Sequence, residues 1–166
     1  DMGALDTVIA ARIQRESILK RLLQPVAGDY DIVILDCPSQ MGMITVNAFT
    51  AANSLIVTIS CDAYAAVGLL QLIDMADVVR NGLNPDLSLD GIVVTRFHTR
   101  RTLDKMVESD VRERYGELVF ETKIRENATI VQAPVVSLDI VSYDPKCNGA
   151  LDYKALMGEI LEKYEK

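Results

Sequence analysis

The feature that most constrains this chain is a run of four consecutive apolar residues, Ile32 to Leu35, which leads directly into Asp36 and is stopped by Cys37-Pro38. A short, unalternating run rich in β-branched residues is typical of a strand in a parallel sheet that is covered on both faces. Open α/β sheets bind their ligands at the carboxyl ends of their strands. The run therefore predicts a buried strand that presents Asp36 to a ligand site, although an aspartate that only caps its loop has the same pattern.

Segments with strand and helix patterns alternate along the chain. Buried apolar runs predict further strands at Leu55–Ile59, Gly91–Phe97, Leu118–Ile124 and Ile140–Tyr143. Helical spacing of apolar residues predicts helices at Leu5–Leu23, Ile44–Ala52, Ala66–Arg80, Leu103–Tyr115, Asn127–Gln132 and Ala150–Tyr164. The alternation favours an α/β fold, a mostly parallel sheet with helices on both faces. We expect the 166 residues to form a single domain, 1–166.

The composition limits the classes of function. The chain is 49% apolar and 25% charged, which is typical of a globular protein, and no apolar run approaches the ~18 residues of a spanning helix. A net charge of -7 argues against a protein that coats nucleic acid with its whole surface. Cys37, Cys61 and Cys147 are odd in number and lack metal-ligand spacing, so we expect a cytoplasmic protein. The last helix carries acidic residues, so we expect no membrane attachment.

Five stretches follow one another along the chain: YDIVILDCPSQMG, NAFTAANSLIVTISCDAYAAVGLLQL, LNPDLSLDGIVVTRFHTR, IRENATIVQAP and YDPKCNGALDY. In this order and spacing they closely resemble the ParA/Soj chromosome- and plasmid-partitioning ATPases, which belong to the MinD/ParA group of deviant Walker A P-loop proteins. The resemblance covers essentially all 166 residues. It implies a P-loop NTPase-like, Rossmann-like three-layer fold that uses ATP and Mg²⁺.

The resemblance also shows what this chain lacks. Proteins of this family open with a strand and a Lys- and Gly-rich loop that holds the phosphates. The pattern G-x-x-x-x-G-K-S/T occurs nowhere in this sequence, and the aspartate of the family's first switch region also falls before its first residue. We therefore expect the carboxyl-terminal two-thirds of a ParA/MinD-type ATPase domain, missing its first strands. Neither ATP nor Mg²⁺ is expected to bind tightly to this chain alone.

In the resemblance, Asp36 matches the Walker B carboxylate, which assists Mg²⁺ mainly through its water shell. It is the one catalytic and metal-binding residue carried over. Pro38 and Gly42 match the second switch region, which contacts the nucleotide. Ser39, Gln40 and Met41 depart from the family's usual residues in that switch.

Three more residues are implied to flank the nucleotide base. Thr95 and Arg96 match the start of the adenine-contacting segment, and Pro134 matches a second loop beside the base. Arg96 is equally well read as a solvated strand-end charge, and Pro134 as a residue that stops a helix. Asp62 and Ala63 match a loop that faces the dimer interface in relatives, and Asp62 is equally well read as a solvated loop residue.

Relatives bind DNA phosphates through scattered basic residues without reading sequence. The candidates for such contacts here are Arg100, Arg101, Lys105, Arg112 and Arg114. Thr129 stands where many relatives have Arg, and the basic stretch that follows Pro134 in relatives is replaced by residues 135–139. His98, the one histidine, has no nucleophile at motif spacing and is interpreted as a surface residue.

The resemblance implies an intact parent in which two ATP-bound subunits pair, bind DNA and separate after slow hydrolysis. Its expected partners are a second copy of itself, non-specific DNA and a ParB-like protein, in a bacterial cytoplasm or on the nucleoid. This chain alone is expected to be inactive. The alternatives are a degenerate, non-catalytic ParA-like interaction module, a receiver domain with Asp36 as phospho-acceptor, and a metabolic P-loop ligase. A receiver needs a first-strand acidic pair and a late lysine, and neither is evident.

Overall fold

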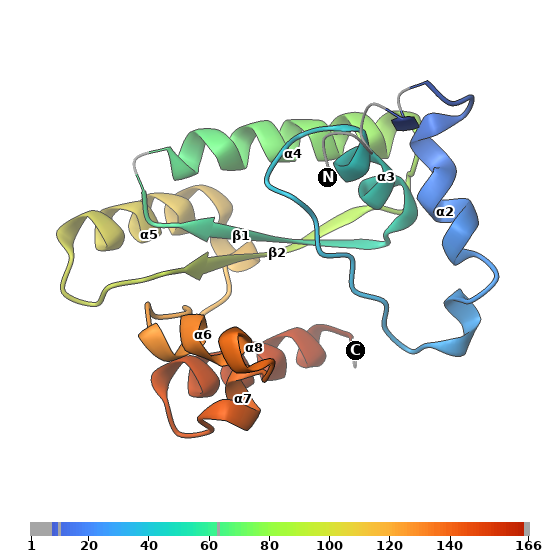
Figure 1. Ribbon diagram of the computed structural model, residues 1–166. Helices are drawn as coiled ribbons and strands as arrows, with labels where there is room; N and C mark the ends of the chain where they lie inside the picture. The colour runs from blue at the N-terminus through green and yellow to red at the C-terminus, as the bar shows by residue number, and fades with distance from the viewer. Residues whose placement is uncertain (1–7, 10, 63, 165–166) are drawn as a thin grey trace. The chain divides into compact units, whose positions relative to one another are not determined.

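The computed structural model describes residues 8–9, 11–62 and 64–164, and Figure 1 shows the path of the chain. In sequence order its elements are η1 (Arg15–Ser17), α2 (Ile18–Leu23), η2 (Ala27–Asp29), α3 (Met43–Ala51), β1 (Ser54–Ser60), α4 (Ala65–Gly82), β2 (Ser88–Thr95), α5 (Thr102–Tyr115), η3 (Gly116–Leu118), α6 (Ala128–Gln132), η4 (Ala133–Val136), α7 (Ile140–Tyr143) and α8 (Asn148–Tyr164). The structure is of the α/β class that the alternating pattern predicts.

Strands β1 and β2 are neighbours in the regular sheet of the described residues. Their arrows point the same way in Figure 1, and α4 connects them. A helix between two parallel strands forms a βαβ unit, which needs a long crossover of this kind. The predicted strands Leu55–Ile59 and Gly91–Phe97 and the predicted helix Ala66–Arg80 are confirmed, with small shifts at their ends.

A third extended segment lies beside β2. Parallel bridges join Ile92 to Val119 and Phe97 to Arg125. The pairing agrees in place and direction with the predicted strand Leu118–Ile124, but these bridges are isolated and the segment is not a continuous strand.

The carboxylate of Glu159, on α8, binds the segment at the interruption. It accepts hydrogen bonds from the backbone N–H groups of Glu121 (2.9 Å) and Thr122 (2.8 Å). The hydroxyl of Thr122 donates to the same carboxylate.

The N–H groups that donate to β2 are those of Phe120, to the carbonyl of Ile92 (3.0 Å), and of Ile124, to the carbonyl of Val94 (2.9 Å). Residues 121–123 between them do not continue the ladder, and two of their N–H groups bond to α8 instead.

The segment predicted as the first buried strand, Ile32–Leu35, is the clearest departure from expectation. It is extended, but within the described part of the chain no strand or bridge includes it. Ile32, Val33 and Ile34 are 63%, 45% and 85% exposed. The prediction of a buried strand is therefore wrong for this structure, because a strand exists only where a neighbour accepts its hydrogen bonds.

The predicted strand Ile140–Tyr143 is also wrong, because the segment forms the short helix α7. Asp139 is its N-cap, and the Asp139 carboxylate accepts the N–H groups of Val141 (2.8 Å) and Ser142 (2.9 Å). Such a cap satisfies backbone donors that a helix start would leave unpaired. Periodicity alone does not distinguish a strand from a helix in a short apolar run. Here the cap formed by Asp139 favours the helix.

Contacts divide the chain into two compact units. The first comprises Asp1–Leu55 and Leu70–Leu89. Its core packs Phe49 of α3 against Ala76 and Val79 of α4 and against Leu87. The side-chain amide of Asn84 donates to the carbonyls of Phe49 (2.8 Å) and Ala52 (2.6 Å), so it satisfies carbonyls at the end of α3.

In the same unit, Asn47 joins α3 to the preceding helices. Its side chain accepts the N–H of Leu19 (3.1 Å) and donates to the carbonyl of Arg15 (2.7 Å). The predicted helix Leu5–Leu23 is confirmed only in part. Residues 5–7 and 10 lie outside the described residues, and Gln14 adopts a left-handed conformation (φ 54°) between residues 8–9 and α2.

The second unit comprises Ile56–Leu69 and Asp90–Lys166. Its core packs Val93 of β2 with Phe120, Ile124 and Leu156 of α8. The predicted helices that became α3, α5, α6 and α8 are confirmed, and Gly116 (φ 53°) ends α5 in a conformation that favours glycine. The single-domain organisation of 1–166 stays a prediction.

Candidate functional site

Asp36 lies at the end of the extended segment, before the turn that leads into α3. Its side chain is exposed, and the thiol of Cys37 beside it lies 3.6 Å from the carbonyl of Leu35. Desolvation by neighbouring protein atoms, and secondarily the charge of Asp36, raise the pKa of the Cys37 thiol although its residue is exposed. Cys37 is therefore not an activated nucleophile, because the thiolate is the reactive form.

The turn after Asp36 is fixed onto the first turn of α3. Gly42 is the N-cap of that helix, and its carbonyl accepts the N–H of Val46 (3.1 Å). The hydroxyl of Thr45, which is buried, donates to the carbonyl of Gln40 (2.7 Å). Pro38 is half-buried in the same turn. Pro38 and Gly42 are thus held by local contacts, whereas Asp36 faces solvent.

Thr95 and Arg96 lie at the carboxyl end of β2. The hydroxyl of Thr95 donates to the carbonyl of Ile59 (3.0 Å), which ties the ends of β1 and β2 together. Arg96 has φ 53°, a conformation that non-glycine residues seldom adopt and that often marks a functional position. Its side chain is exposed. The sequence predicted the place of both residues but contained no sign of the unusual backbone at Arg96.

Asp62 lies in the loop after β1, and Ala63, which follows it, lies outside the described residues. Hydrogen bonds from the Ser60 hydroxyl and from the N–H of Tyr64 (3.0 Å) lower the pKa of the Asp62 carboxyl, and the positive charge of Arg96 adds to this effect. The loops that follow β1 and β2 therefore present one negative and one positive side chain within electrostatic reach. This pairing gives Arg96 a counter-charge that the sequence did not indicate.

Pro134 occupies the first turn of η4, directly after α6. Asn127 caps α6 by accepting the N–H of Thr129 (2.8 Å). Ser137 ends η4 in a left-handed conformation (φ 57°), and its N–H donates to the carbonyl of Pro134 (3.0 Å). Pro134 therefore sits where its fixed φ starts a helical turn, which accounts for the residue without a ligand.

Asp36, Pro38 and Gly42 belong to the first unit, and Thr95, Arg96 and Pro134 belong to the second. Within the second unit Thr95 and Arg96 are adjacent at the strand end.

The candidate DNA contacts divide by their surroundings. Arg100, Arg101 and Lys105 are exposed at the start of α5. The guanidinium of Arg112 contacts Glu108 (3.0 Å) and Glu121 (2.9 Å) and donates to a backbone carbonyl, while Arg114 pairs with Asp110 (3.0 Å).

Arg112 is thus held by protein groups that fix α5 to the segment after η3. A guanidinium held in this way has few N–H groups left for phosphate. Arg100, Arg101 and Lys105 are the better placed of the candidates.

His98 has partners that sequence reasoning missed. Its Nδ1 lies 3.2 Å from an oxygen of Asp104 on α5, and its Nε2 lies 2.7 Å from an oxygen of Glu126. Neither partner stands at a motif spacing. The available signal was Asp104, an acidic residue in the first turn of a predicted helix, which is a favourable position for negative charge.

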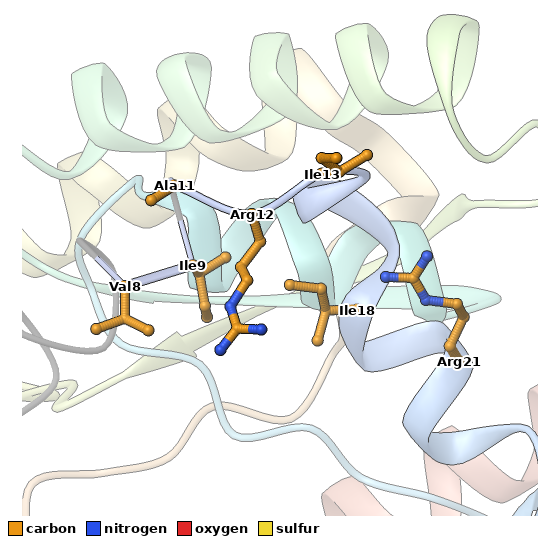
Figure 2. Close-up of a pocket in the computed structure, with 7 residues that line it drawn as sticks. All are labelled: Val8, Ile9, Ala11, Arg12, Ile13, Ile18 and Arg21. Atoms are coloured by element: carbon orange, nitrogen blue, oxygen red, sulfur yellow. The ribbon is translucent and has the colours of Figure 1, made fainter.

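Residues near the start of the described chain line a pocket of about 710 Å³. Figure 2 shows their side chains. The lining of the pocket is apolar apart from two arginines and consists of Val8, Ile9, Ala11, Arg12, Ile13, Ile18 and Arg21. None of the predicted site residues lines it.

Among the residues that the structure describes, no three His, Cys, Asp or Glu side chains are grouped to hold a metal ion. Mg²⁺ usually takes one or two carboxylates and completes its shell with water and phosphate oxygens. Asp36 is a single exposed carboxylate. It fits the carboxylate position of such a shell, in which water and phosphate oxygens supply the other ligands. No described helix is long and apolar enough to cross a membrane.

Comparison with known proteins places these features in a family. A family described as "AAA domain" matches residues 1–89. The chain is 35% identical over 163 residues to the chromosome partitioning protein ParA of Myxococcus xanthus, covering 98% of this chain and 58% of that protein. It is 36% identical over 159 residues to the sporulation initiation inhibitor protein Soj of Bacillus subtilis, covering 96% and 63%.

Among solved structures, one described as cobyrinic acid a,c-diamide synthase from Mycobacterium smegmatis, with bound ADP and magnesium, superposes with a TM-score of 0.80 at 31% identity. The match covers 100% of this chain and 60% of that one. The chain thus spans about three-fifths of the length of these three relatives. It belongs to the AAA domain family and, within that family, to the ParA/Soj-like proteins.

Proposed function

We propose that this chain is part of a ParA/Soj-like ATPase that acts in chromosome or plasmid partitioning in the bacterial cytoplasm. The intact protein pairs with a second copy in an ATP-dependent manner, binds DNA without reading its sequence and responds to a ParB-like partner. The observation that carries this proposal is the identity of 35% and 36% to the ParA and Soj proteins across nearly the whole chain. We infer that 1–166 is one domain of that ATPase.

In this proposal Asp36 assists a Mg²⁺ ion through water, while Pro38 and Gly42 belong to the switch that follows it. Mg²⁺, when bound with ATP, neutralises charge on the transferred phosphoryl group. Asp36 is exposed and lies next to a turn fixed by Gln40 and Thr45. Such a carboxylate keeps its water shell and suits a hard cation that dehydrates reluctantly.

Thr95, Arg96 and Pro134 are proposed to flank the nucleotide base. The left-handed backbone of Arg96 and the attraction between its charge and Asp62 support this role, because both restrict the conformation of the loop at the end of β2. Pro134 restricts the backbone in the first turn of η4.

The proposal predicts that these 166 residues alone bind Mg·ATP weakly, because no glycine-rich phosphate loop is present in the sequence. Calorimetric titration of Mg·ATP into this chain tests it, beside a longer chain that continues upstream of Asp1 if the gene encodes one. No heat with this chain and clear binding by the longer one is the expected result. Tight binding by this chain alone, or turnover on the order of 1 s⁻¹ or above, contradicts it.

The Asp36→Asn variant of the longer chain separates the metal role from folding. Asparagine keeps the shape of the side chain and removes its negative charge, so the Mg²⁺ dependence of ATP affinity should fall. Asp31→Asn, in the same exposed segment, is the matched control and should leave that dependence unchanged. An equal effect of both variants removes the Walker B role from Asp36.

DNA binding is tested by fluorescence anisotropy with a short duplex over a range of salt concentrations. Arg100→Ala and Lys105→Ala should each weaken binding and reduce the salt slope by about 0.9 per lost phosphate contact. Arg80→Ala is the control, since Arg80 is an exposed arginine on α4 that pairs with Asp77 (2.8 Å). Unchanged slopes for all three variants argue that the DNA face lies elsewhere.

Two other functions have specific support. The structural similarity to the cobyrinic acid a,c-diamide synthase of M. smegmatis supports an amide-forming ligase. ATP-dependent amidation of cobyrinic acid by the longer chain tests this function. The exposed, unpaired segment Ile32–Leu35 supports a degenerate interaction module. A gene that starts near Asp1 with no phosphate loop upstream favours the module.

A further inference from the structure

Four large apolar side chains are exposed along α6, η4 and the residues that follow them. Val131, Val135, Val136 and Leu138 are 74%, 83%, 55% and 47% exposed, and these four residues are called the α6–η4 face below. Val131 and Val135 stand four residues apart where η4 directly continues α6, so their side chains lie on the same side. Single exposed apolar side chains need no explanation, whereas a group of them marks an interaction surface.

The segment that carries the α6–η4 face is fixed from its other side. A Cβ at Gly149, in the first turn of α8, would lie 2.6 Å from Cγ1 of Ile130, so α6 lies directly against the start of α8. Ala133 is buried, and its carbonyl accepts the N–H of Leu138 (3.2 Å). The exposed side chains therefore project from a well-packed segment of the second unit, and the face is formed before any partner binds.

Charge selects the partner. Residues 127–138 contain no charged side chain, whereas the whole chain carries a net charge of -7. Binding to nucleic-acid phosphates or to an anionic lipid surface needs Lys and Arg side chains, and this stretch has none. Two copies of an acidic chain repel one another over most of their surface, and least where both surfaces are uncharged.

A second copy of the chain offers the same uncharged apolar face. Pairing of the two faces removes apolar surface from water and desolvates no charged group of this stretch. We propose that the α6–η4 face is a weak contact between two copies of this chain that needs no nucleotide. It is separate from the ATP-dependent pairing of the intact protein under the proposed function.

The position of Asp139 decides the direction of the contact. A two-fold contact uses the same patch on both copies, and the two segments can then run parallel or antiparallel. A parallel arrangement sets the two Asp139 carboxylates side by side, just beyond Leu138. In the antiparallel arrangement each Asp139 lies beside the uncharged start of the partner's segment. The two segments therefore cross near Val135 and run antiparallel, and Val131 of one copy faces Leu138 of the other.

The size of the face sets the strength of the contact. Stable interfaces take about 20–30 residues from each side, and residues 127–138 supply fewer. We therefore expect a dissociation constant weaker than about 1 µM. Because salt screens the repulsion between two acidic chains, added salt should strengthen this contact, whereas it weakens contacts to phosphate.

The test is sedimentation velocity of this chain without nucleotide, from about 10 µM to about 1 mM protein and at about 0.05 M and about 0.5 M salt. A shift from monomer to dimer with rising concentration is expected, at lower concentration in the higher salt. A monomer throughout, or pairing that salt weakens, overturns the proposal.

Val135→Asp should raise the dissociation constant at least about tenfold, since pairing would then bury an unpaired carboxylate. Val78→Asp is the matched control, because Val78 is 72% exposed on α4 and the change adds the same charge. Ile34→Asp probes another exposed apolar segment, and both control variants should pair like the unmodified chain. Equal weakening by Val135→Asp and Val78→Asp, or loss of pairing only in Ile34→Asp, assigns the contact elsewhere and overturns the proposal.

A mixture of two variants tests the antiparallel direction. Val131→Lys and Leu138→Glu should each pair more weakly than the unmodified chain. In an equimolar mixture the introduced ammonium of one chain faces the introduced carboxylate of the other, so pairing should recover. A mixture that pairs no better than either variant alone contradicts the antiparallel contact.

Discussion

The guanidinium of Arg125 and the buried carboxylate of Asp152 form an ion pair that joins the segment beside β2 to α8. Nε of Arg125 lies 2.9 Å from Oδ2 and its second guanidinium nitrogen lies 2.6 Å from Oδ1. The backbone N–H of Arg125 donates to the same carboxylate (2.9 Å). The hydrogen bonds of the guanidinium to Asp152 raise the pKa of Arg125, although partial desolvation opposes them. The pair holds one end of this segment, and Glu159 of the same helix binds its middle.

Removing the guanidinium should therefore leave a buried, under-compensated carboxylate. Arg125→Met should lower the free energy of unfolding by about 1–3 kcal/mol, as expected for a hydrogen bond to a charged group. The control is Arg114→Met, whose pair with Asp110 is about half exposed and should cost less than about 1 kcal/mol. Urea unfolding of both variants measures the difference, and equal losses would show that burial of Asp152 does not matter.

Gly91 lies in β2 directly against the ring of Phe120. A Cβ at this position would lie 2.1 Å from Cε2 of that ring, so Gly91→Ala must displace a buried aromatic side chain. We expect a loss of about 1–3 kcal/mol of stability from overpacking. Gly68→Ala is the matched change, since nothing lies within 4 Å of a Cβ there and the residue is exposed in the interior of α4.

Gly68→Ala should stabilise the chain by about 0.4–1 kcal/mol, because alanine restricts the unfolded chain and favours a helix. Thermal melting of the two variants should give shifts of opposite sign. Two shifts of the same sign contradict this account of Gly91.

Acid should weaken the chain partly through Glu108. Burial alone would raise the pKa of the Glu108 carboxyl, but hydrogen bonds from Lys123 and from Arg112 (3.0 Å), together with their charges, lower that pKa below its usual value of 4.5. A lowered pKa in the folded state means that the ionised group stabilises the fold above about pH 4.5. That contribution is lost as the pH falls through the lowered pKa.

Lys123→Met removes one cause of the lowered pKa, so stability should fall less steeply between about pH 6 and about pH 3. Lys154→Met, which removes the same charge from an exposed site on α8, should keep the slope of the unmodified chain. Urea midpoints across this range provide the measurement. Identical slopes for Lys123→Met and the unmodified chain would exclude Glu108 as a source of the pH dependence.

The cysteines should differ in their reaction with iodoacetamide. Cys61 is 6% exposed, and burial with neighbouring carboxylates raises its pKa to about 11, whereas Cys37 is exposed. At about pH 8 Cys37 should react at least about tenfold faster, since reaction needs an accessible thiolate. Peptide mass spectrometry measures both rates, and in urea the two should become similar. Equal rates in the folded chain would contradict the burial of Cys61.

Sequence patterns predicted the elements that depend on long runs of residues close together in the sequence. Helices α4 and α5 follow from sustained helical spacing, and Gly116 marks the end of α5 in both sequence and structure. The strand at Ile140–Tyr143 failed because four apolar or small residues fit either class, and the carboxylate of Asp139 settled the choice. The break in the strand beside β2 lies where the segment bonds to Glu159, which is distant along the chain and carries no local signal.

The same distinction applies to the candidate site. The places of Thr95 and Arg96 at a strand end followed from the apolar run before them, whereas the left-handed backbone of Arg96 is a tertiary result. His98 was interpreted as a surface residue because its partners, Asp104 and Glu126, come from two other segments. The roles of Asp36, Pro38, Gly42 and Pro134 stay predictions.

The exposed run Ile32–Leu35 has a consequence for the behaviour of this polypeptide in solution. It is a short, uncharged, β-forming segment of the kind that stacks between identical chains into cross-β assemblies. Asp31 and Asp36 stand at its two ends and act as gatekeepers, because an in-register stack would place like carboxylates directly above one another. The carboxylate proposed to assist Mg²⁺ is thus expected also to oppose stacking of neighbouring copies of the chain.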